Sequence, residues 1–243
     1  MIRDYLPSRL QAEDPLPPLG KRIIAFYAEQ FAFIKRMKRF LWISAILFLF
    51  ALIAGIVFFK LNPELTTRWM SKFRADIVRR YPKQMSPWSM FLSILTNNFR
   101  VASIMCLSGL VPFFLPSAIA IIANSGALNL VLAYSWSLHE PVIFRFTTLV
   151  LPHGIVELPT MIFVAGFSLY LSAQMTKRIF RKKRTLPAPS GELFSYVNQD
   201  DVPDRLEAIG DIAKILAGVI LPLVLIAALL ETFVTPFIYR LLT

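Results

Sequence analysis

Ionisable side chains inside long apolar stretches are the first candidates for chemistry in this sequence, because a charge in hydrocarbon is costly and usually has a function. These are Arg100, His153, Glu157 and Glu231, with the amides of Asn97 and Asn98 beside the arginine. His153 and Glu157 are four residues apart and therefore share one helix face. Counted at about 1.5 Å per residue, all four groups lie at similar depths in the outer half of a bilayer. We predict a buried polar cluster in which Arg100 is the cation facing Glu157 and Glu231.

The chemistry open to this set is narrow. A zinc protease needs a His-Glu-x-x-His pattern or an equivalent third ligand, whereas the second histidine, His139, precedes the apolar stretch that holds His153. The sequence has no Gly-x-Ser-x-Gly, no phosphate-binding glycine loop and no cysteine–histidine pair, since its one cysteine, Cys106, lies in an apolar run. We therefore predict no enzymatic activity, no metal and no cofactor. The cluster could simply fix helix packing, or it could serve transport, proton relay or a regulated conformational change.

The apolar stretches that hold these residues predict an all-α bundle that crosses a membrane about five times. Hydrophobic residues make up 56% of the 243 and charged residues only 17%, too few for a soluble domain. Residues 40–59 are uncharged over twenty positions, enough for one retained span. Residues 101–136 would measure roughly 54 Å as one helix, so we predict two spans, about 90–111 and 117–136. Residues 146–173 and 212–239 complete the set.

Two further segments are predicted to be amphipathic surface helices. One lies within residues 1–39, where apolar residues recur at helical spacing before a basic end. The other lies within 60–88, where Asn62 is expected to cap the helix and Pro63 suits its first position. Its predicted apolar stripe is Leu65, Trp69, Phe73, Ile77 and Tyr81, and its predicted headgroup-binding residues are Arg68, Lys72, Arg79 and Arg80.

Basic residues set the expected orientation. Six Lys or Arg fall within 177–184, which predicts a cytoplasmic connector over 177–211. Five spans then place the N-terminus inside and the C-terminus outside, in a cytoplasmic membrane. The seven Lys and Arg of 60–88 would lie outside, against the usual tendency, and a four-span arrangement would export the eight of the N-terminal region instead. Charge alone therefore does not separate four spans from five.

Small and kinking residues within the spans predict close helix packing and irregular turns. The glycines are Gly109, Gly126, Gly154, Gly166 and Gly218, and the prolines are Pro112, Pro116, Pro152, Pro159, Pro222 and Pro236. Because Pro152, His153, Gly154 and Pro159 fall together, we expect the fourth span to begin irregularly, as a kinked or re-entrant segment.

The formal charge of +11 would also suit a nucleic-acid-binding protein. In a protein with several spans, however, basic residues mark cytoplasmic loops and contacts with anionic headgroups. We therefore expect the lipid bilayer, and not nucleic acid, to be the partner of this charge.

Three segments of the sequence resemble the stage II sporulation protein M family. NNFRVASIMCLSG at 97–109 resembles the start of that family's second span, LPHGIVELPTMIFVAGFSLYLS at 151–172 its His-Gly-x-x-Glu-Leu-Pro segment, and LIAALLETFVTP at 225–236 its closing segment. The positions that match the family's signature are Asn98, His153, Gly154, Glu157, Pro159, Glu231 and Pro236.

The resemblance implies a non-enzymatic membrane scaffold, because the sporulation member holds two cell-wall-cutting proteins during engulfment of the forespore. The first functional hypothesis is thus a scaffold that recruits envelope-remodelling partners. The second is a permease or channel subunit that uses the polar cluster and docks an ATPase. Both hypotheses are compatible with a homo-oligomer. A permease should have a polar cavity reaching Glu157 and Glu231, whereas a scaffold should have these acids sealed.

Overall fold

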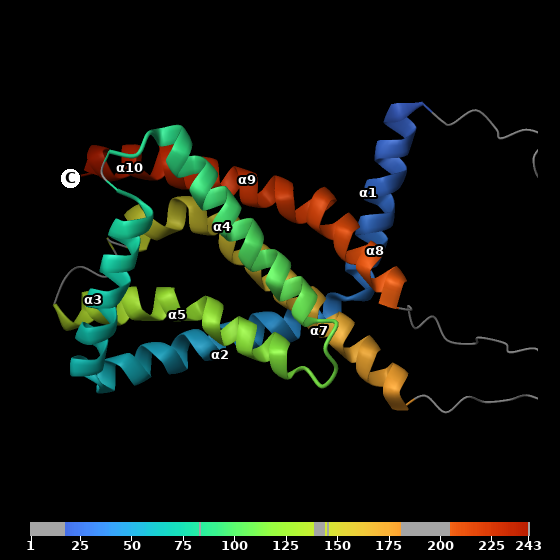
Figure 1. Cartoon of the computed structure of the whole chain (residues 1–243), viewed down its shortest axis with the longest axis horizontal. Helices are drawn as coiled ribbons and strands as arrows, with labels where there is room; N and C mark the ends of the chain where they lie inside the picture. The colour runs from blue at the N-terminus through green and yellow to red at the C-terminus, as the bar shows by residue number, and fades with distance from the viewer. Residues whose placement is uncertain (1–17, 83, 139–143, 145, 181–204, 243) are drawn as a thin grey trace, which may run out of the picture. The chain divides into compact units, whose positions relative to one another are not determined.

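A computed structural model of the chain describes residues 18–82, 84–138, 144, 146–180 and 205–242, and all the elements in them are helical (Figure 1). In chain order these are α1 (Leu19–Arg36), α2 (Lys38–Leu61), α3 (Pro63–Arg80), α4 (Pro87–Ser108), α5 (Leu115–Ser137), η3 (Phe146–Val150), α7 (Leu151–Phe180), α8 (Arg205–Ile215), η4 (Leu216–Ile220), α9 (Leu221–Leu229), η5 (Leu230–Val234) and α10 (Thr235–Leu242), where η denotes a π-helical turn. The chain forms two compact units, Met1–Arg36, which contains α1, and Met37–Thr243, which contains the other described helices.

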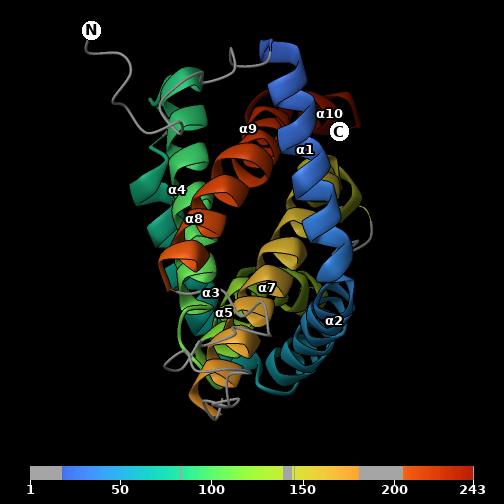
Figure 2. The ribbon, with the colours of Figure 1, turned by 90° about the vertical axis from the view of Figure 1, so that its right-hand side faces the viewer.

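The five predicted spans are confirmed by the length and composition of the helices. α2, α4, α5 and α7 are each long and apolar enough to cross a membrane, and so is the continuous helical stretch Ala208–Leu242. Within the second unit, α9 packs against both α4 and α7 (Figures 1 and 2). α2 packs against α5 and α7. α7 therefore contacts helices from both ends of the sequence, and it contributes more buried residues than any other described helix.

The predicted N-terminal helix is present as α1, which ends on Lys35 and Arg36. Several of its apolar side chains are exposed, among them Ile23 and Ile24. Exposed apolar residues beside basic ones suit a helix lying on a bilayer, and that role stays a prediction. Residues 1–17 lie outside the described part of the chain.

Gly166 marks a close approach between two helices. A Cβ on Gly166 of α7 would lie 2.8 Å from Leu41 Cδ2 and 3.1 Å from Ser44 Oγ, both on α2. The Ser44 hydroxyl donates to the carbonyl of Ile162 across the same contact, at 2.8 Å. Gly166 therefore lies where α7 and α2 approach closely, and the contact is polar as well as close.

Two other predicted packing glycines have no close neighbour from another helix. A Cβ on Gly126 would meet nothing within 4 Å, so the packing prediction is wrong there. The atoms nearest to a Cβ on Gly154 belong to Val150 and Leu158 of its own helical run, at ordinary distances; Gly154 is buried, and its packing role stays a prediction. Periodicity places a glycine on a helix but does not say whether another helix crosses there.

The turn between α4 and α5 is held by hydroxyl groups of α7. Ser168 Oγ lies 3.0 Å from Ser108 Oγ and 2.7 Å from Ser117 Oγ, one on each side of the turn. Ser172 Oγ donates to Val111 O at 2.7 Å, and Thr176 Oγ1 accepts from the backbone N–H of Phe113 at 2.8 Å. These three hydroxyl residues are four apart and so lie on one face of α7.

The turn itself is tight. Phe113 and Phe114 have positive φ values of 71° and 60°, which L-residues adopt only when their surroundings enforce it. A Cβ on Gly109 would lie 2.6 Å from the Ser168 carbonyl oxygen. The chain therefore turns at Pro112 between two helices, as predicted, and Gly109 lies where this turn approaches α7 closely.

α3 begins and ends close to the predicted segment but is turned differently. Pro63 is at its start as expected, whereas the Asn62 side chain does not cap it and donates instead to Phe58 O at 2.7 Å. Its most buried side chains are Thr66 and Met70, one position along from the predicted stripe, in which Trp69 is exposed. The predicted cap is therefore wrong, and the stripe is displaced because α3 packs on α5 as well as α2.

Three of the prolines follow π-helical turns: Pro152 after η3, Pro222 after η4 and Pro236 after η5. Proline has no N–H, and its ring clashes with the carbonyl four residues earlier, so a locally wider turn relieves the clash. The irregular start predicted for the fourth span is thus a π turn, and residues 146–180 contain no re-entrant loop. Pro159 lies inside α7 without one.

The residue before each of the last two prolines closes the wide turn. The Leu221 N–H donates to Leu216 O, and the Thr235 N–H donates to Leu230 O, each five residues back. The Thr235 hydroxyl also donates to Leu230 O, at 3.1 Å. η5 is therefore fixed by a side chain as well as by the backbone.

The predicted polar connector over 177–211 is shorter than expected at both ends. α7 continues through Lys177 to Phe180, and α8 begins at Arg205. Residues 181–204 lie outside the described part of the chain. Long helices extend past a bilayer where their ends are polar, which hydropathy alone does not reveal.

Candidate functional site

His153, Glu157 and Glu231 come together between α7 and η5. His153 Nε2 lies 3.9 Å from Glu157 Oε2, and one ligand atom from each of the three residues lies within 4.8 Å of the other two. The side chains of His153 and Glu157 are only 15% and 24% exposed. The predicted meeting of these three residues is therefore found in the structure, across a sequence separation of 78 residues for His153 and Glu231.

Thr235 is a fourth member that the sequence analysis missed. His153 Nδ1 lies 3.3 Å from Thr235 Oγ1, and that hydroxyl donates its proton to Leu230 O. Oγ1 then accepts from the Nδ1–H, so in the neutral imidazole Nε2 is the unprotonated nitrogen, and it lies on the side of the Glu157 carboxylate. The i, i+4 spacing of Glu231 and Thr235 was the available signal, because it puts both on one face of the last span.

Arg100 is not part of this cluster, so the predicted pairing of Arg100 with the two acids is wrong. Its side chain is exposed, and among the described residues no ion pair joins it to Glu157 or Glu231. The reason is rotation about the α4 axis. Depth along a helix follows from residue number, whereas the direction of a side chain depends on which neighbours the helix packs against.

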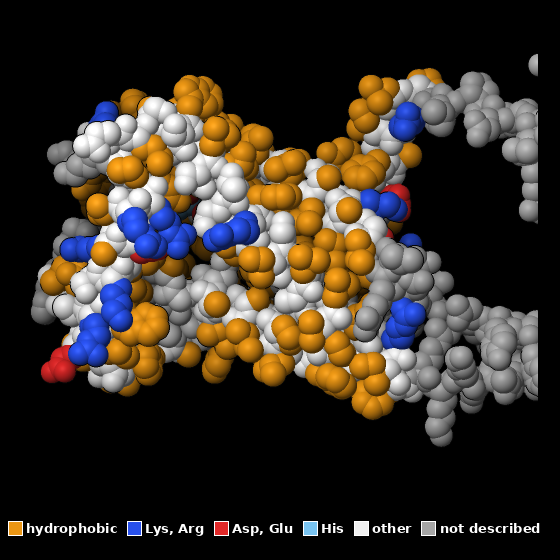
Figure 3. Space-filling view, in the orientation of Figure 1, with side chains coloured by type: hydrophobic (Ala, Val, Ile, Leu, Met, Phe, Trp, Pro, Cys, Tyr) orange, Lys and Arg blue, Asp and Glu red, His pale blue; other side chains and the backbone are white. Residues whose placement is uncertain are grey.

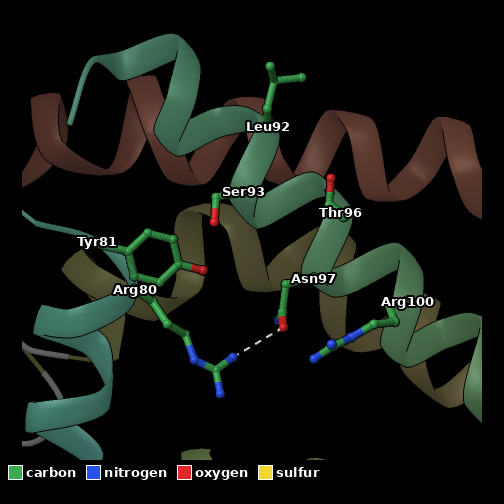
Figure 4. Close-up of a pocket in the computed structure, with 7 residues that line it drawn as sticks. All are labelled: Arg80, Tyr81, Leu92, Ser93, Thr96, Asn97 and Arg100. Atoms are coloured by element: carbon green, nitrogen blue, oxygen red, sulfur yellow. Dashed lines mark hydrogen bonds between the residues drawn. The ribbon is translucent and has the colours of Figure 1, made fainter.

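Arg100 instead lines a hollow of ≈ 390 Å³ between the end of α3 and α4 (Figure 4). The other residues lining it are Arg80, Tyr81, Leu92, Ser93, Thr96 and Asn97. The side chains of Arg80 and Arg100 point toward one another from either side of Asn97 (Figure 4). Two guanidinium groups that converge repel each other unless an anion or water lies between them.

The two asparagines predicted for the buried cluster also lie on this side of α4. Arg80 donates to Asn97 Oδ1 at 3.3 Å, and Asn97 Nδ2 donates to Asn98 Oδ1 at 3.3 Å. Both amides are partly buried. The predicted six-residue cluster is therefore two groups, an acidic one with His153 and a basic one with Arg100.

Tyr81 connects the two groups electrostatically. It lines the basic hollow from the loop after α3. Burial raises the pKa of its hydroxyl above the usual value, and the charge of Glu231 raises it further. The charge of Glu231 thus disfavours ionisation of the Tyr81 hydroxyl.

The predicted headgroup-binding residues, which are Arg68, Lys72, Arg79 and Arg80, are all exposed on α3. Asp76 pairs with Arg79 at 2.9 Å and with Arg80 at 2.7 Å. Figure 3 shows Lys and Arg side chains gathered over α3 and the adjoining part of α4, whereas hydrophobic side chains predominate over the middle of this face. The surface suits anionic headgroups, and binding to them stays a prediction.

Comparison with known proteins identifies a family whose model covers both groups. The family model for Stage II sporulation protein M matches residues 44–236, which include every residue of the two groups. An uncharacterized protein of Methanocaldococcus jannaschii is 32% identical over 148 residues, covering 60% of this chain and 71% of that protein. No solved structure matches the chain.

Proposed function

The chain belongs to the stage II sporulation protein M family, and from this premise we propose that it is a non-enzymatic scaffold of the cytoplasmic membrane. In this role it recruits proteins that remodel the cell envelope. The observation that carries the proposal is the position of the His153–Glu157–Glu231 cluster, at the contact between α7 and the last span. Three hollows in the described part of the chain are lined by other residues. Acids at a helix joint, away from these hollows, favour a packing role over a transport path.

The recruiting surface of this proposal is α3 together with the loop that follows it. α3 is mostly exposed and polar, and a cation–π contact anchors it to α5, with Arg74 over the Tyr134 ring at 5.0 Å. A rigid helix that presents exposed side chains at the end of a bundle is suited to docking a partner.

Site-specific photocrosslinking in cells would test the scaffold. A photoreactive residue at Thr67, exposed on α3, should give adducts with envelope enzymes. The same residue at Leu49, exposed in the middle of α2, should give lipid adducts only. Adducts with the same proteins at both positions, or with none at Thr67, would contradict recruitment by α3.

A permease subunit is the second candidate, because three π-helical turns lie in or beside the spans, of which η3 shortly precedes His153 and η5 contains Glu231. π turns are frequent at functional sites. Glu231→Gln separates the candidates in reconstituted vesicles. If the protein carries a solute and this variant abolishes the flux while keeping its elution volume in detergent, the scaffold proposal fails; equal leakage from wild-type, variant and empty vesicles supports it.

We also propose that the basic hollow of Arg80 and Arg100 receives the phosphate of an anionic lipid. The converging guanidinium groups and the Asn97 amide provide charge and hydrogen-bond donors for a phosphate. A long arginine side chain inside a span reaches toward the headgroups, which Arg100 does by pointing at the end of α3. The lipid bilayer is therefore the first partner in this proposal, and protein partners are the second.

A further inference from the structure

We propose that His153, Glu157 and Glu231 bind a divalent transition-metal ion of the zinc type, which joins α7 to the last span. This goes beyond the proposed scaffold role, since metal binding is independent of any partner protein. One imidazole and two carboxylates are among the ligand sets that zinc accepts in proteins, with a water in the remaining position.

The distances suit a site that closes on the ion. Zinc lies at roughly 2.0–2.2 Å from nitrogen and oxygen ligands, so tetrahedral donors are separated by roughly 3.3–3.6 Å. His153 Nε2 and Glu157 Oε2 are 3.9 Å apart, and no ligand atom in the set is more than 4.8 Å from another. Small rotations about the side-chain bonds of two glutamates bring the donors to ligand distance, without movement of either helix.

The imidazole is oriented for an ion. Because Thr235 donates to Leu230 O, it accepts from the Nδ1–H of His153, and the free lone pair of Nε2 lies on the side of the carboxylates. An unprotonated nitrogen facing a carboxylate makes no hydrogen bond with it, and at 3.9 Å the two atoms are indeed not bonded. Metal-bound histidines characteristically donate their second N–H to an oxygen in this way.

The charges also balance. Two carboxylates and a neutral imidazole carry a charge of about −2, which a divalent cation cancels. In the described part of the chain no Lys or Arg pairs with Glu157 or Glu231. Arg100 lines the hollow between α3 and α4 instead. Uncompensated carboxylates within a membrane are costly, so a bound cation stabilises the contact between α7 and η5.

No metal site was predicted from the sequence because a second histidine was sought as the third ligand and Arg100 was expected to be the cation facing the two acids. The third ligand comes instead from Glu231, which the fold brings across from the last span. Metal sites assembled from distant segments have no fixed spacing by which to recognise them.

Cobalt provides a direct test, because protein-bound Co²⁺ shows visible absorption whose intensity reports its coordination. Purified protein in detergent, stripped with a chelator, should bind one equivalent of Co²⁺ and release it to Zn²⁺. The variants His153→Ala and Glu231→Gln should lose this absorption. Thr235→Val should weaken Co²⁺ binding by about 10–100-fold, because it removes the group that orients the imidazole.

Glu64→Gln is the matched control, since Glu64 is an exposed acid in the first turn of α3, and it should bind Co²⁺ as the wild type does. If Glu231→Gln fails to fold, Glu157→Asp serves instead, because it keeps the charge and should shift the absorption and lower the affinity. Absence of Co²⁺ absorption in the wild type would overturn the proposal, and so would absorption that Glu231→Gln and Glu157→Asp leave unchanged.

Discussion

Gly109, at the α4–α5 turn, and Gly126, in the middle of α5, differ in their surroundings and predict opposite effects of the same substitution. A Cβ on Gly109 would lie 2.6 Å from the backbone oxygen of Ser168, so the turn or α7 must move. We expect Gly109→Ala to lower the free energy of unfolding by about 1–3 kcal/mol, as overpacking does. The measurement is thermal unfolding in detergent, followed by circular dichroism.

Gly126→Ala is the control for this substitution. A Cβ there would meet nothing within 4 Å, and alanine favours the helix over glycine by about 0.5–1 kcal/mol. We expect a small increase in stability. An equal loss in both variants would mean that the close contact at Gly109 is not what limits the turn.

The candidate site could be predicted from the sequence only in part. Residue type and depth correctly selected His153, Glu157 and Glu231, because ionisable groups within spans are rare. They failed for Arg100, because the direction of its side chain is set by the packing of α4 and not by its depth. Thr235 was missed because a hydroxyl in a span is common, and its role depends on a histidine 82 residues away.

At the scale of elements, the π turn η5 positions Glu231 and Thr235 against α7. Pro236→Ala restores an N–H and removes the clash that favours the wide turn, so the segment should relax toward an α-helix and rotate these side chains. We expect Co²⁺ affinity to fall at least about tenfold, as when a group supporting the ligands is lost. Pro222→Ala makes the same change at η4, which holds no ligand, and should leave Co²⁺ binding intact. Equal affinities in the two variants would show that η5 does not position the site.

The end of α3 and the facing stretch of α4 form the second functional element. We expect Arg80→Gln and Arg100→Gln each to reduce retention of anionic phospholipid about fivefold, since one basic residue near an anionic surface contributes about 1 kcal/mol. Native mass spectrometry after exchange into mixed lipid would measure the bound lipid.

Arg240→Gln in α10 removes an equal charge outside the hollow. It should change lipid retention less than either variant of the hollow does. Inorganic phosphate competing away the lipid would indicate recognition of the phosphate itself, whereas equal losses in all three variants would contradict a defined site.

The starts of helices followed from local chemistry more readily than their turns. Pro63 opens α3 as predicted, although Asn62 does not cap it; Pro87 opens α4, where the Ser86 hydroxyl accepts from the Ser89 N–H at 3.2 Å, a cap that was not predicted. These are interactions within a few residues, so the sequence contains them. The π turns depend on how the surrounding helices accommodate the steric clash of a proline ring. The positions of the kinks could therefore be predicted, but not that they are π turns.

At the scale of the whole chain, span number could be predicted and span neighbours could not. Hydrocarbon thickness fixes helix length, which gave five spans from hydropathy and two prolines. The pairing of α2 with α5 depends on contacts such as that of Gly55 with Asn129, whose Nδ2 donates to Ala51 O at 3.2 Å. A polar residue in a span signals such a contact, but not which helix it meets.

An odd number of spans places the segment before the first span and the segment after the last span on opposite sides of the membrane. The basic residues after α7 predict which side is cytoplasmic. α3 and the end of α10 should face outward, and the end of α7 should face the cytoplasm.

Single cysteines test this, in a Cys106→Ser background that removes the one native, buried thiol. Ser71→Cys on α3 and Leu242→Cys on α10 should react with a membrane-impermeant maleimide on intact cells, whereas Ile179→Cys on α7 should react only after permeabilisation. All three side chains are exposed, so access depends on the membrane alone. Labelling of positions 71 and 179 from the same side would rule out this crossing pattern, and labelling of 179 alone on intact cells would invert the orientation while keeping the five spans.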